Sequence, residues 1–354
     1  HMGQEQSFES LPDAVAIQLN DTHPALAITE MMRLLLDEHD LEWERAWDIT
    51  RRVFSYTNHT LLPEALEVWP VEFFERLLPR HLQIIYLINR ELLEQVSARH
   101  PHDHERRQRM SLIDESHGRH VRMAHLAIAG SHMVNGVAKL HSELIKRTIF
   151  ADFAEIFPDR FTNVTNGIAV RRWLKQSNPG LSALLTERLG HGWENDLEEL
   201  ERLRWAADDA ECCARFQEAK DANKVTLARA IQRRIGVEAD ISAMFDVQVK
   251  RIHEYKRQLL NLLYVVTRYN RIRSNPAADF VPRCVIFAGK AAPGYMMAKS
   301  IIKLINNVAQ VVNNDRSIEG RLKVAFLPDY DVSLAQKIMP GADLSEQIST
   351  AGME

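Results

Sequence analysis

The second half of the chain repeats one pattern three times: a short apolar strand, a polar loop and an amphipathic helix. Residues 245–249 alternate apolar and polar side chains and lead into a helix that runs to about Arg273. Residues 284–288 precede a helical stretch at 296–313, and residues 322–327 precede a short helix. Three consecutive strand–helix units predict a parallel, doubly wound α/β sheet.

The first half follows the same logic less regularly. Residues 14–19 and 52–56 read as strands, with helices at 25–38 and 41–50. Asp21 or Thr22 is expected to cap the first of these helices. Residues 71–99 form a helical pattern that Pro79 interrupts, residues 100–109 are interpreted as an exposed loop, and residues 123–150 as a further helix. The charged helical stretch 186–236 is expected to pack on the outside of the second sheet.

Length and charge limit the classes of function. A chain of 354 residues suggests two domains. The formal charge of −4 argues against a general nucleic-acid or anionic-membrane binder, and no apolar run reaches the roughly 18 residues that span a bilayer. Cys212, Cys213 and Cys284 lack zinc spacing and are interpreted as reduced core thiols of a cytoplasmic protein. The histidines near residue 100 are assigned to a solvated turn, so no metal site is predicted.

The strongest chemical signal is the run 250–257 (KRIHEYKR), which follows the first strand of the second half and leads into a helix. It carries four permanent cations: Lys250, Arg251, Lys256 and Arg257. Ligands of open α/β sheets bind beyond the carboxyl ends of strands, and helix N-termini attract anions. The run therefore indicates a phosphate site. The alternative is a solvated basic face of a helix.

Three other loops are weaker candidates. Residues 289–295 (GKAAPGY) match no phosphate-loop motif, so they form either a phosphate cradle or an ordinary turn. Residues 20–24 (NDTHP) and 57–60 (TNHT) present Asn, Thr and His side chains that can bond sugar hydroxyls. Helix capping by Asp21 and Thr60 is the alternative for these two loops.

Long motifs in a fixed order resemble the α-glucan (glycogen, starch or maltodextrin) phosphorylases. They are residues 18–24 (QLNDTHP), 56–60 (YTNHT), 62–66 (LPEAL), 78–86 (LPRHLQIIY), 129–132 (AGSH), 134–137 (VNGV), 165–168 (TNGI), 171–174 (RRWL), 245–260, 289–295 and 342–352. The resemblance covers nearly the whole chain. It implies a glycosyltransferase of GT-B type, with two Rossmann-like domains that face a cleft, assigned here to residues 3–160 and 161–354.

The implied reaction is reversible, retaining phosphorolysis of α-1,4-glucan to α-D-glucose 1-phosphate, with pyridoxal 5′-phosphate (PLP) as cofactor. In this family the cofactor phosphate acts as acid/base partner of the substrate phosphate. Cations must then offset the repulsion of two neighbouring phosphates, which is consistent with the basic run. The resemblance also implies a cytoplasmic homodimer.

The resemblance assigns a role to each matching residue. Arg251 and Lys256 would hold the substrate phosphate, and the backbone carbonyl of His59 would face the developing charge on the glucosyl unit. Substrate contacts are assigned to Asn20, Asp21, His23, Asn166, Tyr255 and Glu354. The cofactor contacts are Lys250, Trp173, Tyr330 and Gln347.

The chain also departs from the family pattern. Ala169 and Val170 replace a usual Thr-Pro, and Asp331 replaces a common Arg after the Tyr330 position. The lysine that binds PLP belongs, in the family, to a segment beyond the position of Glu354. With His1 and Met2 interpreted as tag residues, we expect an internal fragment of a bacterial-type phosphorylase, inactive by itself and prone to self-association. The alternative function is a non-catalytic fragment that at most binds phosphate, sugar or other chains.

Overall fold

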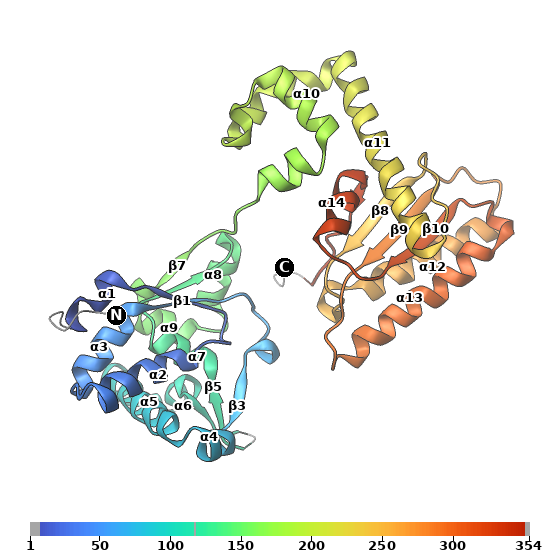
Figure 1. Cartoon of the computed structure of the whole chain (residues 1–354). Coiled ribbons are helices and arrows are strands. Elements are labelled where there is room, and N and C mark those ends of the chain that lie inside the picture. Colours follow the sequence, from blue (N-terminus) through green and yellow to red (C-terminus); the bar gives the residue numbers. More distant parts are fainter. Residues whose placement is uncertain (1–7, 117, 351–354) are drawn as a thin grey trace. The chain divides into compact units, whose positions relative to one another are not determined.

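The computed structural model describes residues 8–116 and 118–350, and they form two compact units (Figure 1). The first unit ends at Gly167 and the second begins at Ile168. Each unit has a four-stranded parallel sheet, so the α/β class predicted from the sequence is confirmed. None of the helices in the described residues is long and apolar enough to cross a membrane.

The first unit is built on the sheet β1-β2-β6-β7, in which every pair of neighbours is parallel. Its strands are β1 (Ile17–Asn20), β2 (Phe54–Thr57), β6 (Met133–Gly136) and β7 (Phe161–Asn163). The helices are α1 (Leu11–Ala14), α2 (Leu26–Arg33, extended by a π turn at Leu34–Glu38), α3 (Trp43–Val53), α4 (Val71–Leu77), α5 (Pro79–Arg99), α6 (His104–Met110), α7 (Met123–Ala129), α8 (Lys139–Arg147) and α9 (Ala151–Ile156). A small antiparallel sheet joins β3 (Val68–Pro70), β5 (His120–Arg122) and β4 (Ile113–Asp114).

The prediction of one helix over residues 123–150 is wrong. Helix α7 ends at Ala129, and the chain then enters strand β6, which pairs with β2 on one side and β7 on the other. Asn135 is nearly buried in this strand, and its side-chain oxygen accepts a hydrogen bond from Thr57 Oγ1 at 2.8 Å. Pairing with distant strands therefore outweighs the local helical pattern.

Residues 100–109 are also not the exposed loop that was predicted, because helix α6 occupies most of them. The Asp103 side chain caps this helix by accepting from the Arg106 backbone N–H at 2.8 Å. Arg106 then forms ion pairs with Glu155 at 2.8 Å and Asp152 at 3.2 Å, both on α9. The helix cap and the ion pairs to α9 together stabilise this polar segment as a helix.

The second unit contains the sheet β10-β9-β8-β11, again parallel throughout. Its strands are β8 (Met244–Val249), β9 (Arg283–Ala288), β10 (Leu322–Leu327) and β11 (Leu344–Ser345). Helices α12 (Gln258–Ser274) and α13 (Met296–Asn314) pack on one face of the sheet, and α11 (Ala210–Ile235) and α14 (Val332–Gly341) on the other. The three predicted strand–helix units are thus confirmed.

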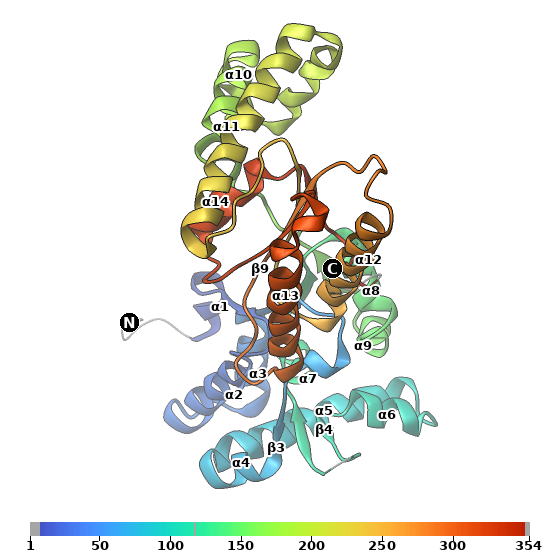
Figure 2. The same ribbon diagram turned by 90° about the vertical axis from the view of Figure 1, so that its right-hand side faces the viewer.

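The stretch 186–236 only partly packs on the sheet. Leu227 and Ile231, near the end of α11, belong to the core on that face. The first half of α11 extends beyond the sheet and packs with α10 (Pro179–Leu189), as Figures 1 and 2 show. Cys213 is exposed there, so the prediction of three core thiols holds only for Cys212 and Cys284.

A buried histidine makes the first unit sensitive to acid. His125 Nδ1–H donates to the backbone carbonyl of Ser111 at 3.0 Å, and the imidazole ring lies edge-on to the Phe153 ring. Burial, and next the charge of Arg122, lower the pKa of His125 to about 4. As pH falls, His125 takes up a proton in the unfolded state before it does so in the folded state. The stability that the neutral, buried ring contributes is therefore complete above about pH 6.5 and is lost as pH falls toward 4. We expect up to about 3 kcal/mol of lost stability over that range.

Urea unfolding curves of the first unit between pH 7.5 and 4.5 measure this loss, and His125→Leu should flatten its pH dependence. His102→Gln, a change at an exposed position, serves as the control. Equal pH slopes for His125→Leu and the unchanged chain would contradict the assignment.

Candidate functional site

The basic loop follows strand β8 and is fixed to the next loop by backbone hydrogen bonds. Lys250 N–H donates to Ala288 O and Ile252 N–H donates to Lys290 O, each at 3.1 Å. Gly289 lies between these two bonds with φ of +154°, and a Cβ there would be 1.9 Å from Lys250 O. The loop 289–295 therefore needs glycine for close backbone approach, which is the ordinary-turn interpretation of this segment. A phosphate-cradling role for this loop stays a prediction.

The loop then turns sharply into α12. A 3₁₀ turn at Glu254–Lys256 is followed by Arg257, which has a left-handed φ of 60°. Gln258 Nε2 donates to Arg251 O at 3.0 Å, and Gln248 Nε2 donates to Lys256 O at the same distance. Two buried amide side chains thus donate hydrogen bonds to carbonyls of the loop and hold its backbone at the end of the strand.

Residues 344–350 run alongside the basic loop and bind it. Lys250 Nζ donates to Gln347 Oε1 at 2.8 Å, and Thr350 N–H donates to Tyr255 O at 2.8 Å. The Arg257 guanidinium donates to the carbonyls of Ile348 and Ser349. Two of the predicted cofactor contacts, Lys250 and Gln347, are therefore brought together.

Aromatic rings surround the far side of the loop. Lys256 Nζ lies 4.8 Å from the centre of the Tyr255 ring, and the His253 ring lies between those of Tyr255 and Tyr295. Tyr295 donates to Glu254 Oε2 at 2.6 Å; burial and this carboxylate raise the pKa of its hydroxyl. Glu254 is the one carboxylate inside the run 250–257, and its bond to Tyr295 occupies one of its oxygens.

In the first unit, the loops after β1 and β2 also meet. His59 Nε2 lies 2.6 Å from Asn20 Oδ1, and Asp21 N–H donates to Thr57 O at 2.9 Å. The carbonyl and amide groups at these strand ends point to the same edge of the sheet, where a ligand of an open α/β sheet binds. Asn20, Asp21 and His59 thus form one cluster.

The capping roles considered for this region are wrong. Ala25, without a side-chain bond, is the N-cap of α2. Asp21 adopts a left-handed φ of 64°, and its carboxylate accepts from Thr22 N–H at 2.8 Å. Thr22 instead donates its hydroxyl to Glu67 Oε2 at 2.9 Å, and Thr60 Oγ1 accepts from Leu62 N–H. The turn is held by bonds within the loops, so its side chains do not serve the helix.

Two neighbours of this cluster were missed in the sequence. Glu67 holds the loop through Thr22 and lies 3.3 Å from His23 Nδ1. His141 accepts from Val137 N–H, and burial together with His59 lowers its pKa. Neither residue stands out by local pattern, because a single Glu or His side chain gives no sign of the distant residues that it contacts.

The remaining predicted residues lie on other segments of the chain. Trp173 lines a hollow with Phe216, Lys220 and Met339, which no other predicted site residue lines within the described residues. Asn166 donates its backbone N–H to Val137 O. Glu354 lies outside the described residues.

Tyr330 packs beside the sheet face covered by α11 and α14, and burial raises the pKa of its hydroxyl. The departure at Asp331 has a structural effect, because this carboxylate caps α14 by accepting from Leu334 N–H at 2.7 Å. In residues 8–116 and 118–350, no group of three or more His, Cys, Asp or Glu side chains is placed to hold a metal ion.

Comparison with known proteins places the chain in a family. The carbohydrate phosphorylase family model matches residues 1–354. The chain is 56% identical over 348 residues to the liver form of glycogen phosphorylase from Bos taurus and 55% identical over 347 residues to that from Homo sapiens. Each match covers 98% of this chain and 41% of the relative, so the chain spans well under half the length of these proteins. The resemblance seen in the motifs is confirmed: the chain belongs to the carbohydrate phosphorylase family.

Proposed function

We propose that the protein that carries this chain catalyses reversible, retaining phosphorolysis of α-1,4-glucan to α-D-glucose 1-phosphate. The observation that carries the proposal is the basic loop at the end of β8, in a chain 56% identical to a glycogen phosphorylase. Four cations on one loop suit a site where phosphate is both bound and stabilised during reaction. The same proposal includes a GT-B arrangement of domains 3–160 and 161–354, a cytoplasmic location and a homodimeric enzyme.

The cofactor of the proposal is PLP, and the donor groups of the second unit suit its phosphate. The Lys250 ammonium and the Gln347 amide lie side by side at the strand end, and the Tyr330 hydroxyl is half-buried in the same unit. Bound PLP would supply a phosphate group able to act as acid/base partner of the substrate phosphate. Lys250 and Gln347 would hold and orient that group, and Trp173 and Tyr330 would line its pocket.

The substrate roles fall to both units. Arg251 and Lys256 would bind the substrate phosphate and offset its repulsion from the cofactor phosphate. Asn20, Asp21, His23, Asn166, Tyr255 and Glu354 would contact the sugar. The His59 carbonyl would stabilise positive charge that develops on the glucosyl carbon, and the bond between His59 and Asn20 fixes the loop that carries it.

Arg251→Ala in the protein that carries this chain tests the proposal. Because the lost charge acts on phosphate in the transition state, we expect kcat to fall about 100-fold or more while glucan affinity changes less than about twofold. Release of glucose 1-phosphate from maltodextrin and phosphate gives kcat, and glucan binding is measured separately. Arg271→Ala, at an exposed position near the end of α12, is the control and should leave kcat unchanged.

An unchanged kcat in Arg251→Ala would refute the role of the basic loop. Binding of phosphate or sugar without any release of glucose 1-phosphate, under conditions that load PLP, would instead favour the non-catalytic alternative.

A further inference from the structure

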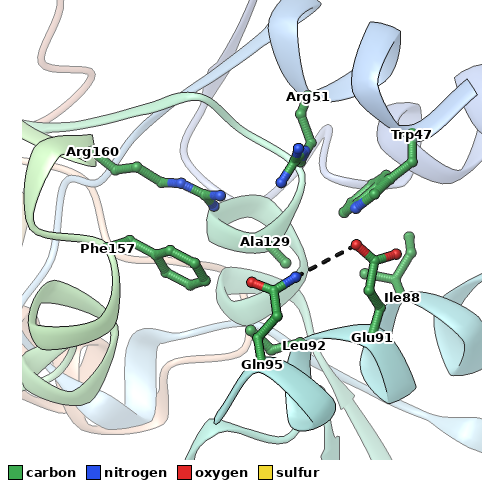
Figure 3. Close-up of a pocket in the computed structure, with 9 residues that line it drawn as sticks. All are labelled: Trp47, Arg51, Ile88, Glu91, Leu92, Gln95, Ala129, Phe157 and Arg160. Atoms are coloured by element: carbon green, nitrogen blue, oxygen red, sulfur yellow. Dashed lines mark hydrogen bonds between the residues drawn. The ribbon is translucent and has the colours of Figure 1, made fainter. Parts of the chain in front are cut away.

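A hollow in the first unit, away from the loops described above, is lined by two arginines and two aromatic rings (Figure 3). Arg51 and Trp47 come from α3, whereas Phe157 and Arg160 follow α9. Figure 3 shows both guanidinium groups pointing toward the middle of the hollow, with Gln95 and Glu91 of α5 opposite them. None of these residues belongs to the loops or motifs described above.

Each guanidinium lies near an aromatic ring that also lines the hollow. The Arg160 guanidinium lies over the Phe157 ring at 3.9 Å, and that of Arg51 lies 5.8 Å from the Trp47 ring. Arg160 donates to the Ile128 carbonyl at 3.3 Å, but the buried Nε of Arg51 has no hydrogen-bond partner among the described residues. An N–H group without a partner at a half-buried site indicates a missing acceptor.

The two positive charges are not neutralised locally. In the part of the chain that the structure describes, no carboxylate oxygen lies within 4 Å of either guanidinium. Burial, and next the charge of Arg51, lower the pKa of Arg160 to about 10. Two facing cations in a hollow repel each other, so an anion between them would relieve that repulsion and accept their N–H groups.

Glu91 lines the hollow but is engaged elsewhere. Its carboxylate accepts from Trp43 Nε1 at 3.1 Å and from Gln95 Nε2 at 3.5 Å. Its negative charge near the hollow therefore weakens the attraction of an external anion. Glu91 does not itself accept the N–H groups of the two arginines. Removing that charge should raise the affinity for an anion, whereas removing either arginine should lower it.

We propose that Arg51 and Arg160 form a binding site for a phosphate dianion, either inorganic phosphate or the phosphate group of a monoester. Two guanidinium groups can donate to the oxygens of such a group and balance its charge of about −2. The hollow has room for about one water-sized group, about 10 Å³, so one phosphate oxygen would lie in it and the rest of the group would stay outside. The site is separate from the basic loop and does not depend on the proposed reaction.

The test follows the indole N–H of Trp47 by NMR while phosphate is added to the whole chain. Arg251→Ala is used as background, so that phosphate at the basic loop does not dominate. We expect a saturable shift of the Trp47 signal with phosphate and sulfate, and at least about tenfold weaker binding in Arg51→Gln and in Arg160→Gln. Glu91→Gln should bind phosphate several-fold more tightly.

Arg52→Gln is the matched control, since Arg52 is adjacent in sequence but exposed and paired with Asp48. It should bind phosphate as the unchanged chain does. If Arg160→Gln fails to fold, Arg51→Gln alone decides. An absent Trp47 shift, equal affinity in Arg51→Gln, or chloride binding as tightly as phosphate would overturn the proposal. Tighter binding of methyl phosphate than of inorganic phosphate would assign a monoester, and the reverse would assign the free ion.

Discussion

Replacing Gly289 by alanine is expected to lower the free energy of unfolding of the second unit by at least about 3 kcal/mol. Its φ of +154° is a conformation that residues with a side chain rarely adopt. The added Cβ would also lie 1.9 Å from Lys250 O and 2.9 Å from the Lys250 carbonyl carbon. Both are backbone atoms at the end of β8, so they cannot give way without breaking the bond from Lys250 N–H to Ala288 O.

The matched control is Gly294→Ala in the same loop, because a Cβ at Gly294 meets no atom within 4 Å. Urea unfolding of the second unit measures both variants. A loss below about 1 kcal/mol in Gly289→Ala would show that the loop adjusts at little cost. Phosphate binding by the basic loop should fall in Gly289→Ala and stay unchanged in Gly294→Ala, since only the first displaces Lys250.

The sheet of the second unit could be predicted because its strands carry their own signal. Strands β8, β9 and β10 are each six residues long and mostly buried, and each is followed by a polar loop and a helix. For these three strands, the structure that the local hydrophobic pattern predicts is also the structure that the fold adopts. Strand β11 has only two residues, both exposed, and nothing local marks it as the fourth strand.

The errors in the first unit arise from contacts between residues far apart in sequence. Strand β6 contains Asn135 and Gly136 and has helices on both sides, so its identity depends on pairing with β2 and β7. Helix α6 looks like a loop because its residues are polar, and it is stabilised by Asp152 and Glu155. No window of local sequence contains these partners.

The basic loop was found from charge and position, whereas its supports were not. Gln248 and Gln258 are buried amides that hold the loop carbonyls, and a Gln within a strand or helix gives no sign of that role. In the first unit, Glu67 is missed for the same reason. Cationic side chains near a strand end can be predicted, but the polar groups that orient them come from the tertiary structure.

A buried ion pair links the core of the second sheet to the segment that holds Lys250. Arg283 Nη1 lies 2.7 Å from Asp246 Oδ2, and Asp246 is fully buried. Asp246 faces Leu344 of β11 in the strand register, and Glu346 N–H donates to Val247 O at 2.8 Å. The position of residues 344–350, and with it the contact between Gln347 and Lys250, therefore depends on this pair.

Two raised pKa values give this region a defined pH dependence. Burial raises the pKa of Asp246, against the effect of Arg283, and burial together with Asp246 raises the pKa of Glu346. The folded state thus binds more protons than the unfolded state above about pH 4. The stability contribution of these carboxyls is complete at low pH and is lost as pH rises through their raised pKa values.

Arg283→Met should accordingly cost little near pH 4.5 and about 3–5 kcal/mol at pH 8, where Asp246 would be a buried charge without its partner. Urea unfolding of the second unit at the two pH values measures the difference. The double variant Asp246→Leu/Arg283→Met removes both charges and should recover most of the loss at pH 8. Arg52→Met, which breaks an exposed pair with Asp48, is the surface control and should stay within about 0.5 kcal/mol.

Phosphate binding at the basic loop distinguishes two causes of instability in the Arg283→Met variant: the unpaired charge of Asp246 and the lost packing of Arg283. If the unpaired charge of Asp246 displaces β11, Gln347 loses its contact with Lys250. Phosphate binding at the basic loop should then weaken at pH 8, under conditions where the unit remains folded. Binding should return in the double variant. A loss of stability that is the same at both pH values, or that the double variant does not relieve, would mean that Arg283 acts by packing against its neighbours, such as the Tyr264 ring 5.6 Å away, and not through its charge.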